Sequence, residues 1–146
     1  MDPNAAAPLT REERERESAL RAYLAAVTEG DLPARRRFYD LLLRARLYVP
    51  VMDDGGSARG FVGRSGQMVL PAFTDESALR TYLTLYVGHA SRFGTLPSAS
   101  IFEMALTTGM DEVAINLGTS PVMILQRPLL EILAAGRNPD GAVTGG

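Results

Sequence analysis

The spacing of apolar residues changes sharply between residues 68 and 86, where a short apolar run gives way to a helical repeat. Residues 68–73 are all apolar, which predicts a buried strand. Asp75 and Glu76 follow, and acidic residues are favourable in the first turn of a helix. The next apolar residues recur three or four positions apart, as on one helix face: Leu79, Tyr82, Leu83 and Tyr86. The pattern predicts a strand followed by a helix whose two tyrosines face the core.

Two further helices are predicted before this unit. Thr10 and Glu13 form a capping-box pattern, and the helix that they begin is expected to end near Gly30. Asp31 and Pro33 have the residue types that begin a second helix. Because the connection is so short, the two helices are expected to be antiparallel neighbours.

The rest of the chain contains short strands and helices. Strands are predicted at residues 47–52, 60–62, 113–116 and 122–125, a polar turn at 88–97, and helices that begin at Ser100 and Pro128 and end at Gly109 and Gly136. The predicted fold class is α+β, with a small mixed or antiparallel sheet of about three to five short strands packed by about five helices, including the N-terminal two-helix hairpin.

The length of 146 residues suits one domain. Residues 1–9 are expected to form a flexible leader, residues 10–136 a single domain, and the glycine-rich residues 137–146 a disordered tail.

The composition lacks the residues that most reaction centres use. The chain has no cysteine, no lysine and a single histidine, His89, so thiol chemistry, Schiff bases and multi-histidine metal sites have little material. We therefore expect no enzyme, no cofactor and no bound metal. The net charge of −2 argues against nucleic acid as a partner for the whole surface. Because no apolar run approaches the length of about 18 residues that a membrane span needs, we expect a cytoplasmic protein.

Three segments resemble one known family: LLRARLYVPV at 42–51, LPAFTDESALRTYL at 70–83 and DEVAINLGTS at 111–120. Over residues 17–136 the chain resembles the N-terminal domain of the SseB family, the enhanced serine sensitivity proteins. Members typically have Asn-Pro-Gly after the last of these strands, where this chain has Asn116, Leu117 and Gly118. The resemblance implies a small cytoplasmic α+β domain of bacteria, without accepted catalytic residues.

The densest basic run consists of Arg35, Arg36 and Arg37. It could bind phosphate or an acidic partner, because guanidinium groups recognise such anions well. The alternative interpretation is that these arginines pair with the acidic first helix, whose carboxylates are Glu12, Glu13, Glu15, Glu17 and Glu29.

A second candidate site follows the strand predicted at 113–116, where ligands often bind at the ends of strands. Its polar or flexible residues are Asn116, Gly118, Thr119 and Ser120. They could form a crevice for a small metabolite, or they could simply stabilise a turn.

The sequence favours a non-catalytic domain that binds another protein and could also form a homodimer. Two alternatives remain open: an electrostatic binder of nucleic acid or phosphate through Arg35–Arg37, and a small-metabolite sensor at the turn Asn116–Ser120. Tyr82 and Tyr86 are interpreted as core residues rather than as an exposed groove for a partner.

Overall fold

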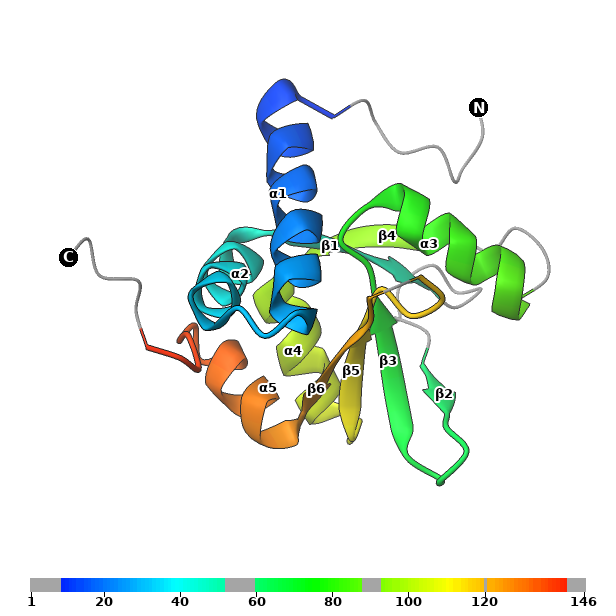
Figure 1. Ribbon diagram of the computed structural model, residues 1–146. Coiled ribbons are helices and arrows are strands. Elements are labelled where there is room, and N and C mark those ends of the chain that lie inside the picture. Colours follow the sequence, from blue (N-terminus) through cyan, green and yellow to red (C-terminus); the bar gives the residue numbers. More distant parts are fainter. Residues whose placement is uncertain (1–8, 52–59, 88–92, 120, 142–146) are drawn as a thin grey trace.

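The computed structural model describes residues 9–51, 60–87, 93–119 and 121–141, which form an α+β fold (Figure 1). In chain order the elements are α1 (Arg11–Thr28), α2 (Leu32–Arg44), β1 (Arg46–Pro50), β2 (Phe61–Val62), β3 (Met68–Ala72), α3 (Glu76–Tyr82), the π-helical turn η1 (Leu83–Val87), β4 (Phe93–Pro97), α4 (Ser98–Thr107), β5 (Glu112–Ile115), β6 (Met123–Gln126) and α5 (Arg127–Ala134). The predicted fold class, with five helices and small mixed and antiparallel sheets, is confirmed.

The N-terminal helix hairpin forms as the capping residues predict. The Thr10 hydroxyl accepts a hydrogen bond from the Glu13 backbone N–H, and the Glu13 carboxylate accepts one from the Thr10 backbone N–H, both at 3.1 Å. The Asp31 carboxylate accepts a hydrogen bond from the Ala34 N–H and so caps α2. The helices α1 and α2 pack side by side (Figure 1).

The strands form two sheets. One is the antiparallel pair β1–β4, and the other has the order β2-β3-β5-β6, in which only β3 and β5 are parallel. A single antiparallel bridge joins the two sheets within the described residues, where Tyr48 and Phe73 exchange two backbone hydrogen bonds of 2.9 Å. Pro71 fits into β3 because β2 pairs only with Met68 and Val69, so β3 has a locally open edge at the proline.

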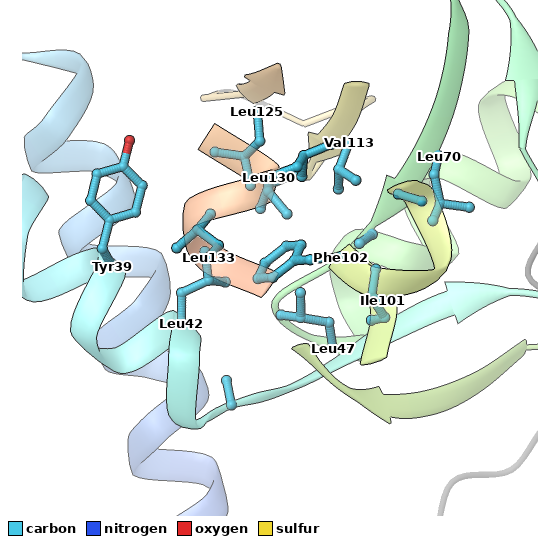
Figure 2. Close-up of a cluster of buried hydrophobic side chains, with 14 of the residues drawn as sticks. Tyr39, Leu42, Leu47, Leu70, Ile101, Phe102, Val113, Leu125, Leu130 and Leu133 are labelled. Atoms are coloured by element: carbon cyan, nitrogen blue, oxygen red, sulfur yellow. The ribbon is translucent and has the colours of Figure 1, made fainter. Parts of the chain in front are cut away.

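The main core lies between one face of the four-stranded sheet and the helices α2, α4 and α5, with α1 behind α2. In Figure 2, Leu70, Val113 and Leu125 of the sheet point toward Phe102 of α4 and Leu130 of α5. A second, smaller cluster surrounds α3 and consists of Tyr48, Phe73, Ala78, Leu79, Tyr82 and Leu83. Strand β1 contributes to both clusters, because alternate side chains of a strand point to opposite faces. Leu47 and Val49 belong to the main core, and Tyr48 belongs to the smaller cluster.

Two sequence-based boundaries are wrong. Residues 93–97, expected within a polar turn, form β4 through pairing with β1, a partner too distant in sequence for a local pattern to show. Helix α4 begins at Ser98 rather than at a Ser100 cap, and no side chain caps it. The Ser98 backbone N–H instead donates to the Ala45 carbonyl at 3.0 Å, which fixes the helix start to the end of α2.

The first residues of the segment expected to be a tail contact α2. Asn138 donates a side-chain hydrogen bond of 2.8 Å to the Arg36 carbonyl, and Asp140 pairs with Arg35. Residues 1–8 of the expected leader and 142–146 of the expected tail lie outside the described residues. Within the described ranges, no helix has the length and apolarity needed to cross a bilayer.

Candidate functional site

The face of the four-stranded sheet turned away from α4 and α5 carries a groove with a volume of about 570 Å³. We call it the sheet groove and define it by its main lining residues: Phe61, Val69, Tyr82, Tyr86, Ala114 and Ile124. Arg64 and Glu112 add charges at its border, and Leu117 adds an apolar side chain from the turn after β5. The volume lies within the range of about 300–1,000 Å³ that is usual for ligand pockets.

The alternation of side chains along the strands produces this groove. Leu70 and Val113 point into the main core, so their neighbours Val69 and Ala114 point to the opposite face. Pairing in register then places Phe61 beside Val69, and Ile124 beside Ala114. The floor is therefore apolar, while Ile124 remains 42% exposed because no helix covers that end of the described sheet.

Tyr82 and Tyr86 form the wall of the groove on the α3 side, and the ring of Phe73 packs behind Tyr82. Phe73 is fully buried, its ring centroid lies 5.2 Å from that of Tyr82, and Tyr82 lies 5.3 Å from Tyr86. Tyr86 belongs to η1 and is 62% exposed, so the prediction of two core tyrosines is correct for Tyr82 and wrong for Tyr86. The reason is that the wider π-helical turn displaces Tyr86 from the regular α-helical stripe.

The predicted turn after β5 supports this wall. Asn116 is 1% exposed and has the left-handed φ of 63°. Its side-chain oxygen accepts a hydrogen bond of 2.9 Å from the Thr74 backbone N–H, and its side-chain nitrogen donates one of 3.0 Å to the Thr74 hydroxyl. Thr119 donates both its backbone N–H and its hydroxyl to the Asn116 carbonyl. Asn116 therefore holds the ends of the parallel strands β3 and β5 together.

Gly118 brings the turn close to the aromatic wall. Its φ is 94°, and a side chain there would place Cβ 3.3 Å from Cε2 of Tyr86 and 3.4 Å from Cα of Tyr82. The backbone conformation favours glycine, and a Cβ at this position would also crowd the ring of Tyr86. Ser120, like His89, lies outside the described residues.

The arginine run is divided between two environments. Arg35 forms a bidentate ion pair with Asp140, with Nε–Oδ2 and Nη2–Oδ1 distances of 2.7 and 2.9 Å. This contact raises the pKa of Arg35. Arg36 and Arg37 are exposed and have no ion pair with any other described residue. The expected pairing of the run with the acidic first helix is not found among the described residues.

The acidic residues of α1 have other partners. Glu12 and Glu15 form ion pairs within the helix, with Arg16 and Arg11, and Glu13 caps the helix. Glu17 accepts a hydrogen bond of 3.2 Å from the Tyr48 hydroxyl. Burial of Glu17 raises its pKa above the ordinary value of 4.5, although the Tyr48 hydrogen bond partly opposes this shift.

We expect Glu17→Gln to be more stable than the unmodified chain at pH 7, and this advantage to shrink on acidification. A carboxyl group with a raised pKa in the folded state is destabilising while charged, and it becomes favourable as the pH falls through that pKa toward 4.5. Urea unfolding of both proteins at pH 7 and pH 5 measures the difference in free energy of unfolding. A difference that is constant or grows on acidification would contradict the assignment to Glu17.

The structure thus defines a small α+β domain with one partly uncovered sheet face bordered by tyrosines. The family model described as SseB protein N-terminal domain matches residues 20–131, and the chain belongs to the SseB family. This confirms the resemblance seen over residues 17–136. A search of curated proteins found no match.

Proposed function

We propose that this domain is a non-catalytic protein-binding module and that the sheet groove is its binding surface. The observation that carries the proposal is Tyr86, a large side chain that is 62% exposed and yet held by the aromatic chain behind it. Tyrosines that are already fixed in place lose little conformational entropy on binding and are frequent in the centres of protein interfaces.

The chemistry of the groove also supports binding rather than catalysis. Its described lining contains one carboxylate, Glu112, one guanidinium, Arg64, and one amide, Gln67, and its other side chains are apolar or aromatic. Acid–base or nucleophilic catalysis needs a nucleophile, base or acid set by a neighbouring group, and this described lining offers no such pair in contact.

A photo-crosslinking amino acid placed at Ile124 tests this proposal in the native host. Position 124 lies in the groove and is 42% exposed, so we expect a discrete crosslinked protein product. The matched control is position 32, because Leu32 is also an exposed apolar residue, at 61%, but lies at the start of α2. Tyr86→Ala should abolish the product formed at position 124. Equal products at both positions, or a product insensitive to Tyr86→Ala, would contradict the proposal.

A second candidate surface is the exposed pair Arg36 and Arg37. It is supported by their lack of ion pairs with other described residues, and by Arg137, which lies next to the Asn138 contact with α2 and is also exposed. Binding of an acidic partner or nucleic acid there would weaken steeply with salt, whereas binding in the largely apolar groove would depend on salt less steeply.

A further inference from the structure

Two oppositely charged side chains border the sheet groove at one end. Arg64 lies in the turn that joins β2 to β3, and Glu112 begins β5, in register with Val69 of β3. The strand order places the two residues on opposite sides of β3, at the end of the sheet where the β2–β3 hairpin lies (Figure 1). Neither residue forms an ion pair with another described residue.

We propose that the sheet groove binds a second copy of this chain, face to face about a two-fold axis that runs along the strands between β3 and β5. Such a rotation exchanges the two sides of the groove and keeps its two ends in place. Arg64 of each copy then faces Glu112 of the other, so the interface contains two symmetry-related pairs of opposite charge. A border with one cation and one anion is complementary to itself, as a two-fold interface requires.

The apolar residues of the groove follow the same symmetry. Phe61 lies on β2 and Ile124 on β6, the two outer strands of the sheet. The rotation brings β2 of one copy over β6 of the other, so these two apolar side chains approach each other across the interface. Between them lie Val69 and Ala114, which form the apolar floor of the groove and are themselves almost fully buried within one copy. Exposed apolar surface bordered by polar groups is typical of an interface.

This inference rests on the proposed function and names the protein that the groove binds. An unrelated partner could be recognised by any arrangement of charges at the border, whereas a second copy needs a border, such as Arg64 with Glu112, that is complementary to itself. The self-complementary border therefore favours a second copy over an unrelated protein, and it makes the inference testable with purified protein alone.

Charge exchange between Arg64 and Glu112 tests the inference by sedimentation equilibrium. The unmodified chain should form a dimer at micromolar concentration. Arg64→Glu and Glu112→Arg should each weaken the dimer at least about tenfold, because each places like charges opposite one another twice. Mixing the two variants should restore a dimer that contains one copy of each, and the double variant Arg64→Glu/Glu112→Arg should dimerise again.

The control is Arg11→Glu, which changes the charge of the chain as much as Arg64→Glu does but lies on α1, outside the groove lining. A monomeric unmodified chain at 100 µM, roughly a hundred times the scale of a micromolar dissociation constant, would overturn the inference. So would single variants that dimerise normally or a mixture that fails to form a mixed dimer. If crosslinking at position 124 yields a different protein while the chain is monomeric, the inference fails and the proposed function stands.

Discussion

Replacing Phe73 by alanine is expected to lower the free energy of unfolding by about 3–5 kcal/mol, the usual cost of removing a buried phenylalanine. Phe73 is fully buried, its ring packs against Tyr82, and its backbone forms the bridge to Tyr48. The alanine variant leaves a cavity beneath the aromatic wall, so Tyr82 and Tyr86 lose the support that fixes them. Urea unfolding measures the loss of stability, and near-ultraviolet circular dichroism measures the order of the tyrosines.

Phe102→Ala is the matched control for this prediction. Phe102 is also fully buried, but it belongs to the main core between the sheet and α4. Both variants should lose similar stability, whereas only Phe73→Ala should abolish crosslinking at position 124. The tyrosine signal alone does not separate the two variants, because Tyr39 belongs to the same core cluster as Phe102. The chain has no tryptophan, which keeps the tyrosine signal free of overlap. Equal effects of the two variants on crosslinking at position 124 would show that the aromatic chain does not hold Tyr86.

Asn116→Ala is expected to cost about 2–4 kcal/mol. Removal of the side chain leaves the buried Thr74 N–H without its partner, at about 1–3 kcal/mol, and alanine at φ 63° adds roughly 1 kcal/mol of backbone strain. Urea unfolding at pH 7 measures the sum of both effects.

Asn116→Gly separates these two effects. Glycine adopts the left-handed conformation without strain, so this variant should lose the hydrogen bonds and be about 1 kcal/mol more stable than the alanine variant. If alanine and glycine were equally destabilising, the strain would be negligible. If Asn116→Ala cost less than about 0.5 kcal/mol, the range usual for surface substitutions, Asn116 would not hold the two strands together.

Local sequence signals predict most of the elements correctly because their causes are local. Asp75 accepts a hydrogen bond from the Ala78 N–H at 2.8 Å and begins α3 as its position suggests. Pro128 lies in the first turn of α5, where its missing N–H costs nothing. Thr10 and Asp31 cap their helices in the same way. In each case the residue that sets the boundary lies within four positions of the group that it satisfies.

The candidate site depended on contacts that the sequence pattern does not contain. Asn116 stands out in the sequence, but its partner Thr74 lies 42 positions away. Arg35 and Asp140 are 105 positions apart, so the sequence could not show which carboxylate would pair with the arginine run. The groove arises from the order of four strands, and the exposure of Tyr86 arises from one π-helical turn. The spacing of Tyr82 and Tyr86 is the available sequence signal, and by itself it predicts a core stripe.

The two sheets meet at one bridge, Tyr48 with Phe73, and the described lining of the groove takes no residue from β1 or β4. Substitutions in that two-stranded ladder therefore affect the groove only indirectly, through folding and through Tyr48, which packs in the cluster behind the groove wall. In the larger sheet, alternate residues of each strand face either the groove or the main core. Selection for binding therefore acts on one set of positions, and selection for folding acts on the other. Relatives of this domain could thus change their binding partner through substitutions at the groove-facing positions, while the core-facing positions evolve at a different rate.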